Sequence, residues 1–135
     1  MPTLGAMSNH LEESILNGTL RNITYSAPDN VYLALYTSDP TDNDTGTEVD
    51  GTGYVRQSVS FTSPTQTEGR ATVENDAEIE FAIAESNWGT ITHMGIRDSD
   101  TGGNLLYHGE LATSKTIDQG DQFRVQAGDL VIDLD

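Results

Sequence analysis

The stretch WGTITHMGIRDSDTGGNLLYHGELAT, residues 88–113, decides the fold. Two runs in which apolar and polar residues alternate flank the turn sequence SDTGG at residues 99–103. A Gly-rich linker of this length between two such runs is typical of a β-hairpin. The sequence therefore predicts a central paired hairpin in which Met94, Ile96 and Leu105 are buried.

The hairpin also carries two of the three histidines in the chain, His93 and His108. A pairing that places Ile96 near Leu105 or Leu106 brings the two imidazoles close together across the strands. A zinc site needs a further protein ligand, and the chain has no HExxH or GxSxG spacing. We expect a structural cross-strand pair without a bound metal, and keep a metal or proton-switch role as the alternative.

Further runs with one apolar face lie on both sides of the hairpin. In VYLALYT, residues 31–37, the apolar residues Val31, Leu33 and Leu35 alternate with their neighbours. The other runs are residues 54–62, 77–83, 122–126 and 129–135. Seven or eight short strands separated by turn residues predict a mainly β fold, an antiparallel β-sandwich or jelly-roll-like barrel over residues 30–135.

One helix is predicted before the strands, over residues 4–17. Asn9 followed by Glu12 fits a capping box, and the dipeptide Asn-Gly at residues 17–18 supplies a stop signal. Apolar residues recur at helical spacing at Leu4, Met7, Leu11 and Ile15. We expect this helix to pack its apolar side against a sheet or a neighbouring subunit.

Length and composition narrow the class of protein. A chain of 135 residues is the size of one domain, so residues 1–135 are expected to form a single unit with its own core. The absence of cysteine excludes disulfides, thiolate zinc sites and thiol nucleophiles. No apolar stretch is long enough to cross a bilayer, so we expect no membrane insertion.

The net charge of −16 is the strongest compositional feature. A surface this negative repels phosphate backbones, which argues against nucleic acid as a partner. Lys115 is the only lysine in a chain rich in Asp and Thr. This balance resembles that of proteins from extreme halophiles, where molar salt shortens the Debye length to about 3 Å and screens the self-repulsion.

The most acidic segment is SDPTDNDTGTEVD, residues 38–50. An EF-hand loop requires glycine at its sixth position, where this chain has Asp44, and no helices flank the segment. A less regular cation site and a solvated loop joining two strands both remain, and the sequence favours the loop. The candidate cation ligands are Asp39, Asp42, Asp44, Glu48 and Asp50. No cofactor is predicted.

The remaining candidate residues are apolar or aromatic. Trp88 is the only tryptophan, and together with the tyrosines it suits core packing, a subunit contact or a sugar-stacking platform. The candidate interface residues are Leu11, Ile15, Trp88 and Tyr107. No set of residues converges on a catalytic arrangement, so the sequence predicts a protein that is not an enzyme.

Taken together and in order, the motifs resemble a family of small virion proteins from tailed double-stranded DNA viruses, usually labelled tail-fibre, minor capsid or decoration proteins. The similarity covers nearly the whole chain, from about Ser8 to Asp135. It rests on SNHLEESIL, NVYLALYTSDPTD, GTEVDGTGYVRQ, WGTITHMGIRDSDTGGNLLYHGEL and GDQFRVQAGDLVIDLD.

The resemblance implies a non-enzymatic structural part of a virus particle, located in the virion, and it supplies no catalytic residue. With the Lys-poor acidic composition, it indicates a virus of a halophilic host. A domain of this size has a radius of gyration of about 14 Å and cannot form a long shaft alone. We therefore expect a homo-oligomeric decoration or turret subunit of the head, or a tail or baseplate subunit, in contact with major capsid or tail proteins. The alternative is a lectin-like module that binds host-surface glycans, with or without a cation.

Overall fold

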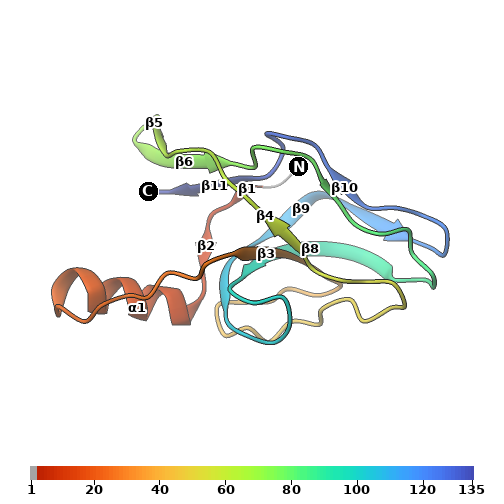
Figure 1. The fold of residues 1–135 in the computed structure, drawn as a ribbon, viewed down its shortest axis with the longest axis horizontal. Helices are drawn as coiled ribbons and strands as arrows, with labels where there is room; N and C mark the ends of the chain where they lie inside the picture. The colour runs from red at the N-terminus through yellow and green to blue at the C-terminus, as the bar shows by residue number, and fades with distance from the viewer. Residues whose placement is uncertain (1–2) are drawn as a thin grey trace.

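The computed structural model describes residues 3–135 and confirms a mainly β protein with one N-terminal helix (Figure 1). Eleven strands occur in these residues, where the sequence predicted seven or eight. The elements are β1 Thr3–Leu4, β2 Ala6–Met7, α1 Asn9–Leu20, β3 Val31–Tyr36, β4 Gln57–Val59, β5 Thr65–Thr67, β6 Arg70–Glu74, β7 Ile79–Glu80, β8 Gly89–Arg97, β9 Leu105–Ile117, β10 Arg124–Val125 and β11 Val131–Leu134.

The strands form three sheets. The largest has the order β2-β9-β8-β3-β4 and is antiparallel throughout. A second sheet has the order β1-β11-β6-β5, and its β1–β11 pair is parallel, which the sequence did not predict. A short β10–β7 pair completes the set. The two larger sheets form two layers, as in a β-sandwich (Figure 1).

The predicted hairpin is confirmed as β8–β9, and β3 pairs with the other edge of β8. Met94, Ile96 and Leu105 are buried, as expected. Ile96 lies opposite Tyr107, next to the expected Leu105 or Leu106 in the chain, and the ladder shifts between Ile96 and Arg97, which lies opposite Leu105. The alternation of apolar and polar residues within one strand cannot reveal such a bulge. A bulge changes which residues of the two strands lie opposite one another, while the alternation along the partner strand stays the same.

This register also changes the relationship between the two histidines. His93 lies opposite Glu110, and His108 lies opposite Gly95. The imidazoles therefore share a face of the sheet as diagonal neighbours and are not a directly opposed pair.

The main core fills the space between the two layers. Apolar residues from both larger sheets and from the β7–β10 pair contribute to it, and the largest buried members include Phe81, Phe123, Leu4, Leu33, Leu35, Ile91, Met94, Ile96 and Leu130. The other face of the five-stranded sheet is also covered, since Ala34, Tyr36 and Leu105 form a second buried group there. Both faces of β3 are thus buried, which explains its continuous apolar run.

The helix begins later than predicted. Leu4 and Met7 lie in β1 and β2, so the spacing that suggested a first helical turn belongs to two short strands. The N-cap is Ser8, and its hydroxyl accepts a hydrogen bond from the Leu11 amide at 3.1 Å. Asn9 is the first helical residue and not the cap.

The helix also ends later than predicted. It continues through the Asn-Gly dipeptide at residues 17–18 to Leu20. The turn is made by Asn22, whose φ of 57° is in the left-handed region that asparagine tolerates well. No helix in residues 3–135 is long and apolar enough to span a membrane.

Two apolar residues in the predicted strand runs 54–62 and 77–83 are not on a buried face. Val55 and Ile83 are 60% and 57% exposed, although each continues an apolar alternation. Both lie outside the ordered strands, where the chain has left the sheet and the period of two no longer applies.

Candidate functional site

The acidic loop, defined as residues 39–50, lies between β3 and β4 and covers the outer face of the five-stranded sheet. Its backbone is tied to both neighbours. The Val49 amide donates to the Leu35 carbonyl at 2.9 Å, and the Asn9 amide at the start of α1 donates to the Asp42 carbonyl at 2.8 Å. The loop therefore links the helix to the sheet.

Asp44 is held by Arg97, the last residue of β8. The guanidinium binds the carboxylate in a bidentate way, with Nη1–Oδ1 at 2.7 Å and Nη2–Oδ2 at 2.8 Å. The same group donates to the Tyr36 hydroxyl and to the carbonyls of Gly102 and Gly103 in the β8–β9 turn. The Arg97 side chain is 8% exposed and that of Asp44 is 33% exposed, so the pair is partly open to solvent on the carboxylate side.

Glu48 is held in the same way by Arg56. Nη2 and Nε of Arg56 donate to the two carboxylate oxygens at 2.7 and 2.8 Å, and the Tyr54 hydroxyl donates to Oε2 at 2.6 Å. Arg56 also donates to the carbonyls of Ser99 and Gly102. Two arginines thus fasten the β8–β9 turn to the acidic loop.

The histidines face this loop as well. His108 Nε2 lies 2.8 Å from Asp42 Oδ1, and His93 Nε2 lies 4.0 Å from Asp39 Oδ1. Each histidine therefore faces a carboxylate of the acidic loop. The segment is a loop that joins β3 and β4, in which Asp42, Asp44 and Glu48 each contact a histidine or an arginine.

The candidate cation ligands do not converge. Four of the five carboxylates contact an arginine or a histidine, and Asp50 is exposed. Residues 3–135 contain no group of three His, Asp or Glu side chains placed to hold a metal ion. A bound divalent cation would have to displace the arginines, which already supply the positive charge.

The pKa shifts follow from the same geometry. Burial alone would raise the pKa of Glu48, but hydrogen bonds from Arg56 and Tyr54 outweigh it and lower that pKa below its ordinary value of 4.5. Burial, followed by the bonded Glu48 carboxylate, raises the pKa of Tyr54. Desolvation opposes the charge on Arg97, yet the bonds to Asp44 and Tyr36 raise its pKa overall. Glu48 and Arg97 are therefore charged and Tyr54 is neutral at neutral pH.

This cluster is chemically closed. Within residues 3–135, no buried side-chain nitrogen or oxygen lacks a hydrogen-bond partner. The arginine–carboxylate pairs hold the loop, the sheet and the hairpin turn together.

Two of the candidate interface residues belong to the core of the protomer. Leu11 and Trp88 are 4% and 5% exposed, which leaves little of either side chain for a partner. The Trp88 indole donates to the Thr52 carbonyl at 3.1 Å and packs edge-on against Tyr54. Ile15 and Tyr107 are only partly buried and remain accessible.

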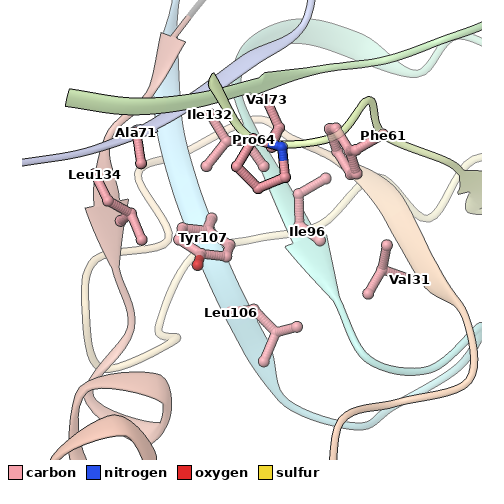
Figure 2. Close-up of a pocket in the computed structure, with 10 residues that line it drawn as sticks. All are labelled: Val31, Phe61, Pro64, Ala71, Val73, Ile96, Leu106, Tyr107, Ile132 and Leu134. Carbon is pink, nitrogen blue, oxygen red and sulfur yellow. The ribbon is translucent and has the colours of Figure 1, made fainter. Parts of the chain in front are cut away.

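Tyr107 lines an apolar groove of about 280 Å³ between the two layers of the sandwich (Figure 2). Side chains from the five-stranded sheet form one wall, and Ala71, Val73, Ile132 and Leu134 of β6 and β11 form the other. No charged residue lines it. Most of these residues lie in the predicted strands. The sequence could not show that a groove remains between the two sheets at this place.

A second apolar surface lies on the end of α1 and the segment that follows it. We call residues 16–25 the arm. α1 extends to one side of the two layers (Figure 1), and Leu16, Leu20, Ile23 and Tyr25 along the arm are exposed. None of these four side chains lines the apolar groove of the same chain.

A polar hollow of about 340 Å³ lies between the arm and the β8–β9 turn. His10, Tyr25, Asp98 and Asn104 are among its lining residues. Asn104 donates to both carboxylate oxygens of Asp98, at 2.7 and 3.1 Å. Burial opposes ionisation of Asp98, but these bonds lower its pKa overall, so it presents a charged acceptor to the hollow.

A family model described as "Podophage GP4 fiber I protein gp80" matches residues 6–133. The chain belongs to this family. Fiber I proteins of this kind are virion proteins of tailed phages, so the chain is a virion structural protein and is localised in the virion, where it associates with other virion components. No curated protein matches the chain. The resemblance inferred from the ordered motifs is thereby confirmed, and the family match spans both layers of the sandwich and the arm.

Proposed function

We propose that this fiber I family member is a non-enzymatic assembly subunit, which acts by associating with copies of itself and by docking onto a capsid or tail protein. One observation carries the proposal. The buried polar side-chain atoms of residues 3–135 all have hydrogen-bond partners, whereas two apolar surfaces, the groove and the arm, stay open. Open apolar surfaces on a soluble domain mark contacts with other proteins.

The proposed place of the subunit is the exterior of the particle. A compact domain of 135 residues cannot form a shaft by itself, so it would serve as a decoration or turret subunit of the head, or as a subunit of the tail or baseplate. Gold-labelled antibody against the chain, applied to intact particles, tests this directly. Labelling at either place supports the proposal, and labelling only of disrupted particles would contradict it.

The charge suggests the working conditions. We propose that the subunit assembles at high salt, in a virus of a salt-adapted host. A net charge of −16 opposes close packing of copies, and salt screens this repulsion. Uptake of purified protein onto depleted particles should rise from millimolar to molar sodium chloride, and uptake that falls over this range would oppose the proposal.

A second candidate function is glycan binding, and the polar hollow is the observation that favours it. A charged acceptor, an amide, an imidazole and a half-exposed tyrosine surround it, which suits the hydroxyls and apolar face of a sugar ring. A glycan array probed with the wild type, Tyr25→Ala and the matched control Tyr32→Ala tests it. Binding lost only in Tyr25→Ala supports the site, and absence of any bound glycan contradicts it.

A further inference from the structure

The polar hollow between the arm and the β8–β9 turn contains a carboxylate without a cationic partner. Asp98 forms no ion pair within residues 3–135. The Asn104 backbone amide donates to its Oδ1 at 2.7 Å, and the Asn104 side-chain amide donates to its Oδ2 at 3.1 Å, so neutral donors hold the carboxylate in place. Each carboxylate oxygen can accept more than one hydrogen bond, so Asp98 can bind a further donor in the hollow.

Two cationic groups act on this carboxylate, and neither of them neutralises it by contact. Arg97 precedes Asp98 in the chain, but its guanidinium is bound to both carboxylate oxygens of Asp44. His10 lines the same hollow and carries a charge only when it is protonated. The hollow therefore presents a negative charge that attracts a cationic ligand.

An aromatic ring lines the hollow together with this carboxylate. Tyr25, at the end of the arm, is 37% exposed. Burial, followed by the charge of Asp98, raises the pKa of its phenol, so the two side chains lie within electrostatic reach of each other. A carboxylate and an aromatic ring in one hollow suit an organic ammonium ion, which forms a charged hydrogen bond with the first and a cation–π contact with the second.

The rest of the lining distinguishes one kind of ammonium ion from another. The hydroxyls of Ser14, Thr24 and Ser26 and the side-chain amide of Asn17 also line the hollow, which has a volume of about 340 Å³. These groups suit the hydroxyls of a sugar ring, whereas the alkyl stem of a lysine side chain would leave them without hydrogen-bond partners. A sugar that carries an amine matches both the charge and the polar lining.

We propose that the polar hollow binds an amino sugar, with the ammonium group between the Asp98 carboxylate and the Tyr25 ring and the hydroxyls on the surrounding polar side chains. The inference rests on the second proposed function, glycan binding, and deepens it by naming the class of sugar. A neutral sugar of the same shape would leave Asp98 without a cation, so the charge of the ligand decides which sugar is bound.

NMR titration of the isotope-labelled full chain at pH 7 compares glucosamine with glucose, which has a hydroxyl in place of the amine. Glucosamine should shift the side-chain amide of Asn104 and the backbone amide of Tyr25 saturably. Its dissociation constant should be roughly five- to twentyfold lower than that of glucose, because only the amine forms a charged hydrogen bond with Asp98. Equal constants for the two sugars would overturn the inference.

A chain with a net charge of −16 attracts any cation to some extent, so a pair of substitutions tests the site itself. Asp98→Asn keeps an oxygen for the Asn104 backbone amide but removes the charge, and it should raise the dissociation constant of glucosamine roughly five- to twentyfold. The matched control is Asp100→Asn, which removes the same charge from an exposed position two residues away and should leave the constant unchanged. Equal losses in the two variants would show a response to net charge alone and overturn the inference.

The aromatic ring is tested separately. Tyr25→Phe keeps the ring and should bind glucosamine as the wild type does, whereas Tyr25→Leu should bind it severalfold more weakly. Wild-type affinity in Tyr25→Leu would contradict the proposed position of the ammonium group.

The results separate the inference from glycan binding. Glucose that binds as tightly as glucosamine leaves glycan binding intact and overturns only the choice of an amino sugar. No saturable shift with either sugar, together with a glycan array on which nothing binds, contradicts both. Nα-acetyl-lysine amide that binds as tightly as glucosamine would show that the hollow recognises the ammonium group of a protein side chain, and the assignment to a sugar would be wrong.

Discussion

Arg97 and Asp44 form a bidentate ion pair across 53 positions of sequence, with both N–O distances below 3 Å. Arg97 ends β8, and Asp44 lies in the acidic loop, so the pair fixes the loop onto the central hairpin. The pair between Arg56 and Glu48 acts in the same way. Two carboxylates of the acidic loop thus neutralise two buried guanidinium groups.

Removal of the Asp44 charge should destabilise the fold. Asp44→Asn keeps the shape and tolerates the left-handed φ of 58° at this position, but leaves Arg97 without its counter-ion. We expect the free energy of unfolding to fall by about 1–3 kcal/mol, a value set by the loss of a charged hydrogen bond that is partly open to solvent. Urea unfolding followed by Trp88 fluorescence measures it.

The control is Asp50→Asn, which removes the same charge from an exposed position of the same loop and should change stability by less than about 0.5 kcal/mol. Equal effects of the two substitutions would mean that the ion pair is not what stabilises the loop.

Acid should weaken the fold through Glu48. Its pKa is lowered in the folded protein, so its contribution to stability is present above the ordinary pKa of 4.5 and is lost as the pH falls through the lower, folded-state pKa. Glu48→Gln should therefore be less stable than wild type at pH 7, and the difference should shrink as the pH falls below 4.5. Urea unfolding at a series of pH values gives this difference, and Glu78→Gln, at an exposed position, serves as the control. A difference that grows towards low pH is the contrary result.

Two glycine substitutions should act in opposite directions. A Cβ at Gly95 would lie 2.7 Å from Leu105 Cδ1 and 2.9 Å from Tyr36 Cε1, so Gly95→Ala should cost about 1–3 kcal/mol through overpacking. Gly18 lies inside α1 with no contact closer than 3.5 Å, so Gly18→Ala should stabilise the protein by about 0.5–1 kcal/mol. Thermal unfolding compares both with the wild type. A destabilised Gly18→Ala would indicate that the helix ends at residue 17, as the sequence suggested.

Calcium should find no tight site in the acidic loop. Asp42, Asp44 and Glu48 already contact a histidine or an arginine, so binding would require these partners to be displaced. Isothermal titration of chelator-treated protein with calcium should show no saturable binding at micromolar concentration. Saturable binding that disappears in Asp44→Asn would show that the loop is a cation site.

The hairpin was predictable from the sequence because apolar and polar residues alternate in its strands around a Gly-rich turn. The helix start was not, because Leu4 and Met7 have a spacing that fits both a helical turn and two separate strands. Only pairing with β9 and β11 distinguishes these alternatives, and that pairing joins positions about a hundred residues apart.

The role of the acidic loop could not be read for a related reason. The nearest arginine partner of Asp44 is Arg97, and nothing local to either residue specifies the other. One signal was available: Arg97 follows the apolar residues Met94 and Ile96 at the end of a strand, and an arginine buried at such a position needs a carboxylate partner. The groove is lined by residues of two different sheets that are distant in the sequence. The sequence pattern of each strand does not show how the two sheets lie relative to one another, so the groove could not be predicted.

The most direct test of self-assembly is sedimentation velocity of the purified chain across a salt series. The Debye length rises from about 3 Å at molar salt to about 30 Å at 0.01 M, so repulsion between copies with a charge of −16 grows as salt is diluted. We expect oligomers at molar sodium chloride, with the acidic loop outside the contact, and their progressive dissociation towards millimolar salt without added divalent ions. A single monomeric species at every salt and protein concentration would contradict the account.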